Sequence, residues 1–180
     1  MLAQPLFVSS AHMKRITIIG GGASGTLLAV NLLRHAGDAA IEINLVERRS
    51  RVGRGVAFGT MQPSHLLNVP CGRMGAFPGE IGHFHDWLTA NGHICDPHDF
   101  IPRRLFGEYL RHVFDKETVQ LKPNLRLNII DDEAVDMSVN GSSAEVMLRS
   151  GEIVPSHHVV LAFGNFDPPH PSVADLKFID

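Results

Sequence analysis

A cluster of glycines directly after a β-branched run is the feature that most constrains the fold of this chain. Residues 16–19 are typical of a strand, and Gly20, Gly22 and Gly25 follow with the spacing G-x-G-x-x-G. At this spacing the first glycine permits a tight turn, the second lets a pyrophosphate approach the backbone, and the third lets a helix pack close to the strand. The start of that helix presents N–H groups and partial positive charge to phosphates. The motif therefore predicts a dinucleotide site.

An acidic residue follows where such a unit needs one. Residues 41–46 form a second apolar run, and Glu47 ends it, about 20 residues after Gly25. A carboxylate there accepts hydrogen bonds from ribose hydroxyls and repels a 2′-phosphate. Two alternatives are that Glu47 is only an exposed strand end, or that Arg48 and Arg49 clamp a 2′-phosphate. The order of strand, glycines, helix, strand and acid favours the ribose.

Composition limits the class of protein. The chain has 180 residues, enough for one domain with a core, and its formal net charge of −3 gives no electrostatic reason to expect nucleic acid or an anionic membrane as a partner. No apolar stretch reaches the length of a membrane span. Residues 1–13 lack a basic start and are predicted to be a disordered leader rather than a signal peptide. Cys71 and Cys95 form no disulfide framework, which favours the cytoplasm, although a bond between them stays open.

The rest of the pattern predicts one α/β domain over residues 14–180. Helices are expected over 22–35, 81–90 and 102–114, and parallel strands over 16–19, 41–46, 125–130 and 158–162. Short strands over 134–139, 144–149 and 152–154, separated by Asn140-Gly141 and Ser150-Gly151, form a β-meander. The predicted fold is a Rossmann-like, doubly wound parallel sheet of order 3-2-1-4 with a β-meander crossover. Residues 48–80 are rich in glycine and proline yet contain apolar side chains, which indicates an ordered loop around a large ligand.

Several segments together resemble a known family. They are residues 16–26 (ITIIGGGASGT), 46–48 (VER), 53–60 (GRGVAFGT), 65–74 (HLLNVPCGRM), 76–78 (AFP), 102–110 (PRRLFGEYL) and 161–165 (LAFGN). This pattern is similar to the bacterial FAD/NAD(P)-binding family of hydroxylase-like flavoproteins, which have the glutathione-reductase-type FAD fold. The resemblance covers residues 14–170, and 53–78 is its most specific part.

The resemblance implies FAD as the cofactor, with NAD(P)H as an electron donor, in a flavin-dependent, monooxygenase-like oxidoreductase. It implies that the glycine turn surrounds the pyrophosphate, that Glu47 binds the adenosine ribose, that Arg54 lies near the phosphates and that residues 65–68 run beside the ribityl chain or the flavin ring. Phe163 replaces a threonine of the family pattern, and Gly164 is retained. The cofactor-binding residues predicted in this way are Gly20, Gly22, Ala23, Ser24, Gly25, Glu47, Arg48, Arg54, Gly55, His65, Leu67, Asn68, Val135, Ala162 and Gly164.

The length of the chain suggests an N-terminal fragment of a longer protein, because members of the family carry further sequence that reaches the flavin ring. A fragment of this kind is expected to be inactive alone and to self-associate through the surface that truncation exposes. A nicotinamide-only dehydrogenase domain and a non-catalytic dinucleotide-binding module remain as alternative functions.

No catalytic residue and no metal site is assigned. The cluster of His83, His85, His93, Cys95 and His98 matches no closed zinc module, and is expected at the surface or the cofactor edge. Arg103 and Arg104 open a helix, where they either bind an anion or are solvated.

Overall fold

The computed structural model describes residues 13–48 and 52–165. Most of the predicted leader therefore lies outside the described residues. Met13, assigned to that leader, is buried, and the first strand begins directly after it. In the described part of the chain, no helix has the length and apolar character needed to cross a membrane.

A four-stranded parallel sheet forms the centre of the molecule. It consists of β1 (Lys14–Ile19), β2 (Ile41–Val46), β3 (Leu125–Ile130) and β7 (His158–Leu161), in the order β3-β2-β1-β7. This confirms the predicted order 3-2-1-4, since β7 is the fourth parallel strand. Ile19 is level with Val46 and with Leu161, and Val46 is level with Ile130. The carboxyl ends of all four strands therefore share one edge, where ligands bind in open α/β sheets.

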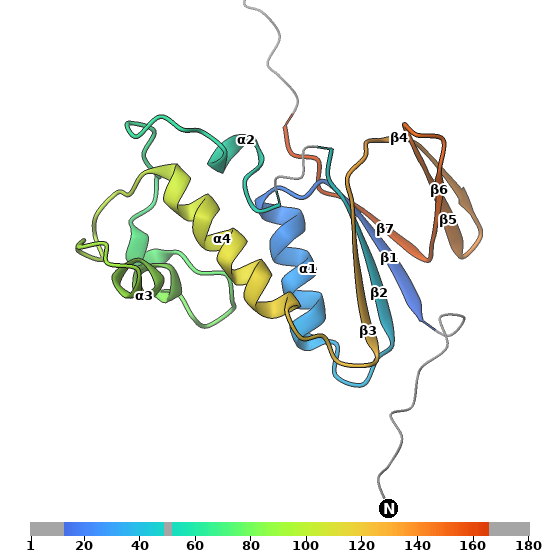
Figure 1. Ribbon diagram of the computed structural model, residues 1–180, viewed down its shortest axis with the longest axis horizontal. Helices are drawn as coiled ribbons and strands as arrows, with labels where there is room; N and C mark the ends of the chain where they lie inside the picture. The colour runs from blue at the N-terminus through green and yellow to red at the C-terminus, as the bar shows by residue number, and fades with distance from the viewer. Residues whose placement is uncertain (1–12, 49–51, 166–180) are drawn as a thin grey trace, which may run out of the picture.

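α1 (Ala23–His35) covers one face of this sheet, α4 (Arg103–Thr118) lies beside α1, and α3 (His83–Ala90) lies beyond α4, away from the sheet (Figure 1). α1 and α4 pack on each other and bury Val30, Leu33 and Leu110 in the main core. α4 continues four residues beyond the predicted end at Phe114. The last turn contains no apolar residue, so the apolar periodicity of the sequence does not predict it. In this turn the Thr118 hydroxyl donates a hydrogen bond to the Phe114 carbonyl at 2.8 Å.

An antiparallel sheet covers the opposite face (Figure 1). It consists of β4 (Ala134–Asn140), β5 (Ser143–Leu148) and β6 (Ile153–Ser156), in the order β4-β5-β6. Val146, Leu148 and Val154 pack against Val46 of the parallel sheet in a second hydrophobic core. The predicted crossover is confirmed, and in this doubly wound arrangement the meander takes the place that helices hold on the first face.

The glycine-rich segment after β2 is ordered over its described part. It contains the short helix α2 (Gly55–Phe58) and the 3-10 turn η2 (Cys71–Arg73). Val52, Leu67 and Phe77 from this segment are buried in the main core. The burial of these apolar side chains explains why the segment is ordered and is not a flexible linker. Its contact with a ligand stays a prediction.

Candidate dinucleotide-binding site

The turn from β1 to α1 has a backbone path that only glycine follows without strain. Gly20 has a φ of +104°, and a Cβ there would overlap the carbonyl oxygen of Ala162 at the end of β7. A Cβ on Gly25 would overlap the carbonyl oxygen of Gly20. The first glycine therefore makes the turn, and the third brings the helix against it, as the spacing predicted.

The first turn of α1 faces the carboxyl edge of the sheet. Gly22 caps the helix, and its carbonyl oxygen accepts the amide of Thr26 at 2.9 Å. The amides of Ala23, Ser24 and Gly25 precede that bond, so they have no acceptor within the helix. Together with the helix dipole they favour an anion at this point.

Glu47 stands directly beside the glycine turn. Its Oε2 accepts the backbone amide of Gly21 at 2.8 Å, and its own amide donates to the Ile130 carbonyl at 2.9 Å. A Cβ on Gly21 would lie 2.9 Å from the Cβ of Glu47, so the two backbones are in close contact. The carboxylate is half-buried. A carboxylate has several lone-pair positions, so one bond to Gly21 is compatible with accepting ribose hydroxyls.

A buried hydroxyl ties the next loop to the turn. Thr26 is 1% exposed; its Oγ1 donates to the Gly21 carbonyl and accepts the Gly53 amide, both at 2.9 Å. The Gly53 amide also lies 2.8 Å from the Gly21 carbonyl oxygen. These contacts fix the start of the glycine-rich segment over the turn. Sequence reasoning missed Thr26, whose position just after the third glycine was the available signal.

This connection brings Arg54 and Gly55 to the glycine turn. A Cβ on Gly55 would lie 3.1 Å from the Cα of Gly22, and a Cβ on Gly22 would meet only the Cα of Gly55, at 3.6 Å. Arg54 caps α2 and is exposed. The backbones of Gly22 and Gly55 therefore lie close together, with no side chain between them. Arg48 also lies near this edge, but its guanidinium is 3.6 Å from the Glu133 carboxylate, which neutralises part of its charge.

The strip containing His65, Leu67 and Asn68 is anchored to the start of α4. The Leu67 amide donates to the Ile101 carbonyl at 2.9 Å, and the Arg103 amide donates to the His65 carbonyl at 2.8 Å. Leu67 as a whole is buried in the core, whereas His65 and Asn68 are exposed. Their contact with a flavin stays a prediction.

The last three predicted positions lie on the meander and after β7. Val135 on β4 is 48% exposed. Ala162 follows β7, which ends one residue earlier than expected, and its amide donates to the Ile19 carbonyl at 2.7 Å. Gly164 has a φ of +76° and lies in open space. The structure thus brings Ala162 against Gly20 at the sheet edge, while Val135 is not tied to the glycine turn by any contact described for it.

Two of the clustered histidines and both arginines at the start of α4 have partners within the chain. His83 Nδ1 is 2.7 Å from the Tyr109 hydroxyl, and His85 Nε2 is 3.2 Å from the Cys95 carbonyl oxygen. Arg103 donates to the Leu66 carbonyl, and Arg104 pairs with Glu108 at 2.9 Å. Among residues 13–48 and 52–165, no group of His, Cys, Asp and Glu side chains is arranged to hold a metal ion.

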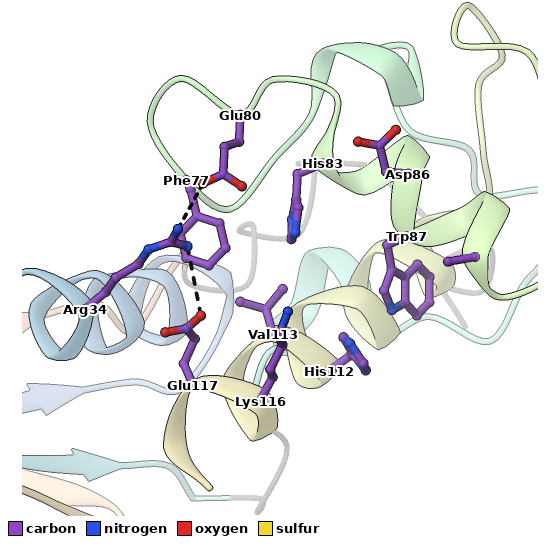
Figure 2. Close-up of a pocket in the computed structure, with 11 residues that line it drawn as sticks. Arg34, Phe77, Glu80, His83, Asp86, Trp87, His112, Val113, Lys116 and Glu117 are labelled. Carbon is purple, nitrogen blue, oxygen red and sulfur yellow. Dashed lines mark hydrogen bonds and ion pairs between the residues drawn. The ribbon is translucent and has the colours of Figure 1, made fainter. Parts of the chain in front are cut away.

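A cavity of about 350 Å³ lies away from the glycine turn, between α1, α3 and α4 (Figure 2). Arg34 on its rim lies over the Phe77 ring at 3.8 Å and pairs with Glu80 at 3.0 Å and Glu117 at 3.9 Å. Arg34 is near the end of α1, about 16 Å along the helix from Ala23. Arg34 thus joins α1 to α4 and to the loop before α3. Because Arg34 lies at the opposite end of α1 from the glycine turn, this cavity is not part of the dinucleotide edge.

Comparisons with known proteins agree with this architecture. The family model described as FAD-NAD(P)-binding matches residues 17–166. An L-aspartate N-monooxygenase (nitrosuccinate-forming) of Streptomyces davaonensis is 25% identical over 203 residues, which covers 91% of this chain and 31% of that protein.

Solved structures show the same fold. A flavin-containing monooxygenase from Stenotrophomonas maltophilia has a TM-score of 0.57 and 21% identity, covering 84% of this chain and 39% of that chain. OTEMO, solved in complex with FAD and NADP, has a TM-score of 0.56 and 18% identity, covering 90% and 27%. The chain therefore spans about a third of the length of these relatives.

Proposed function

Because the chain belongs to the FAD-NAD(P)-binding family, we propose that its glycine turn and Glu47 hold the adenosine diphosphate part of FAD. We further propose that the chain is the FAD-binding part of a flavin-dependent, monooxygenase-like oxidoreductase with NAD(P)H as electron donor. Cytoplasmic location in a bacterium belongs to the same proposal, supported by two free cysteines and by the bacterial relatives.

One observation carries the proposal. Where Gly22 meets Gly55, no side chain lies between the two backbones, the place is at the start of α1, and Glu47 flanks it. A pyrophosphate needs such a bare surface, because any side chain there would keep its oxygens from the amides. A ribose next to it needs an acceptor for two hydroxyls, and the Glu47 carboxylate is one. The residues present therefore fit the adenosine diphosphate part of FAD.

Each part of the edge has its own task in this proposal. The amides of Ala23, Ser24 and Gly25 bind phosphate oxygens, and the Arg54 guanidinium adds positive charge beside them. Thr26 keeps the loop carrying Arg54 in place through Gly53. When bound, the flavin supplies the electron-transfer chemistry, and the chain supplies position and electrostatics.

Two other functions predict different binding. A nicotinamide-only dehydrogenase domain would take NAD in preference to FAD, and a non-catalytic module would bind the dinucleotide without any turnover in the whole protein. The monooxygenase proposal is favoured by the L-aspartate N-monooxygenase relative. Oxidation of NAD(P)H by the whole protein with FAD would distinguish it from a module.

Flavin-fluorescence titration of a Gly22→Val variant tests the assignment. A branched side chain there occupies the pyrophosphate position, so FAD binding should be abolished. The fold should persist, because Gly22 has a φ of −66° and an added Cβ approaches nothing closer than 3.6 Å. Gly82→Val is the matched control, since Gly82 has a φ of −83° and open space around it. Equal FAD affinity of the folded Gly22→Val variant and the parent would contradict the proposal.

A further inference from the structure

Two cysteines that are far apart in the sequence come together beside the main core. The Cys71 thiol donates a hydrogen bond to the carbonyl oxygen of Asp96, 3.3 Å away, and Asp96 is the residue next to Cys95. Both cysteine side chains pack in the same hydrophobic cluster, Cys71 within it and Cys95 at its edge. Both are free thiols, and the sequence contains no other cysteine.

The backbone already holds the two cysteine segments against each other. The Cys71 amide donates to the Asp99 carbonyl at 3.0 Å, and the Gly72 amide donates to the Pro97 carbonyl at 2.8 Å. A Cβ on Gly72 would lie 2.6 Å from the Cβ of Pro97, so no room is left between the segments. Since disulfide formation requires closely spaced backbones, a bond here needs little movement of the chain.

We propose that Cys71 and Cys95 are a site of reversible oxidation, where a hydroperoxide converts the two thiols into an intrachain disulfide. In the first step the Cys95 sulfur attacks the peroxide, the O–O bond breaks, and Cys95 becomes a sulfenic acid while an alcohol or water leaves. In the second step the Cys71 sulfur attacks the Cys95 sulfur, and the displaced hydroxide leaves as water with the Cys71 proton. Two thiols lose two electrons, and the peroxide gains them.

The burial of each cysteine assigns Cys95 as the thiol that is oxidised first and Cys71 as the thiol that attacks it. Cys71 is 0% exposed, whereas Cys95 is half-buried and therefore meets a dissolved oxidant first. Burial, and after it the neighbouring Cys95 thiol, raises the pKa of Cys71 to about 11. Cys71 is therefore protonated at neutral pH and, being excluded from solvent, is not the first thiol to meet a peroxide. It attacks the neighbouring oxidised Cys95 as its proton passes to the departing hydroxide.

The site lies apart from the glycine turn, and its chemistry does not depend on bound FAD. Cys71 follows closely after the strip that contains His65 and Asn68. A disulfide would fix the end of that strip to the loop before α4. Oxidation would thus act on a segment predicted to lie beside the flavin, without touching Glu47 or the glycines.

The test uses the purified, fully reduced chain and hydrogen peroxide. We expect two titratable thiols before treatment and none after it, with the chain still monomeric on a non-reducing gel and lighter by the mass of two hydrogens. Trypsin should release residues 55–73 linked to residues 74–103, because cleavage after Arg73 separates the two cysteines. Dithiothreitol should restore both thiols.

Single variants establish the order of the steps. In Cys71→Ser, Cys95 should form a sulfenic acid that dimedone traps; in Cys95→Ser, Cys71 should keep its thiol under the same treatment. Disulfide-linked dimers, two unchanged thiols, or irreversible oxidation of Cys95 in the parent chain would each overturn the proposal. Rapid loss of the Cys71 thiol in Cys95→Ser would overturn the assignment of roles.

Discussion

Among single residues, Glu47 has the most specific proposed task, which is to discriminate between nucleotides with and without a 2′-phosphate. Its carboxylate binds the Gly21 amide and is proposed to accept the ribose hydroxyls. A hydrogen bond to a charged group contributes about 1.5–3 kcal/mol, so Glu47→Ala should weaken FAD binding roughly 10- to 150-fold. The same change should reduce discrimination against adenosine 2′-phosphates, because the like-charge repulsion disappears.

Fluorescence titrations with FAD, and competition with ADP and its 2′-phosphorylated analogue, measure both effects. Glu47→Gln is the matched variant, since its amide oxygen still accepts the Gly21 amide while the charge is lost. We expect it to fall between the parent and Glu47→Ala. If Glu47→Ala binds FAD as tightly as the parent, the ribose assignment is wrong.

Thr26 is a second single residue with a testable role, which is to stabilise the folded chain. Thr26→Val keeps the shape of the side chain but removes one acceptor of the buried Gly53 amide and one donor to the Gly21 carbonyl. These two backbone groups still bond to each other at 2.8 Å, so the free energy of unfolding should fall only by the net contribution of the lost hydrogen bonds, about 0.5–1.5 kcal/mol each. Thr26→Ser retains the hydroxyl and should lose less. Urea unfolding measures both variants, and equal stability of Thr26→Val and the parent would refute the role of this hydroxyl.

At the scale of elements, Tyr109 joins α4 to α3 and to the segment before it. Its hydroxyl accepts the Ala76 amide at 2.8 Å and contacts His83 at 2.7 Å, and the side chain is fully buried. Burial raises the pKa of Tyr109 from 10.0 to about 12. The unfolded chain therefore loses this proton near pH 10, while the folded chain keeps it up to about pH 12.

Stability should consequently be complete below pH 10 and fall as the pH rises toward 12, by at most about 3 kcal/mol from this group. Urea unfolding in reducing buffer between pH 8 and 11.5 measures the decline. Tyr109→Phe should be less stable at pH 8, because the Ala76 amide loses its partner, and should lack the tyrosine part of the decline. Cys71, whose pKa is also raised, contributes equally in both proteins. The same decline in Tyr109→Phe would contradict this account.

The secondary-structure elements also show which parts of the fold could be predicted from the sequence. β2 and β3 were predicted to the residue, because short runs of apolar residues bounded by turn signals mark strands both at the centre of the sheet, as for β2, and at its edge, as for β3. The glycine turn was predicted because its motif is legible in the sequence, where Gly20 and Gly25 each answer a local steric need. Two hydrogen bonds were not predicted, the one that the Gly53 amide donates to Thr26 and the one that Arg103 donates to Leu66, because these residues become neighbours only when the chain folds. For Arg103 the structure therefore provides a partner where the sequence left an anion and solvent as alternatives.

For the whole molecule, the described residues of the proposed site suit only one end of the cofactor. The glycine turn, Arg54 and Glu47 gather at the carboxyl edge of the sheet, and all of them suit phosphates and a ribose. The chain spans about a third of the length of its relatives, so contacts to the flavin ring and the activity of the whole protein remain proposals. Exposed apolar side chains such as Val56, 87% exposed, and Met61, 73% exposed, are compatible with the predicted self-association, which stays a prediction.

The most direct measurement compares the affinities of this chain for ADP, FAD and FMN by isothermal titration calorimetry. If the glycine turn and Glu47 hold the adenosine diphosphate part, ADP should bind almost as well as FAD and compete with it for one site. FMN lacks that part and should not compete. Displacement of FAD by FMN but not by ADP would contradict the account, because the cofactor would then be held by its flavin end and not at the glycine turn.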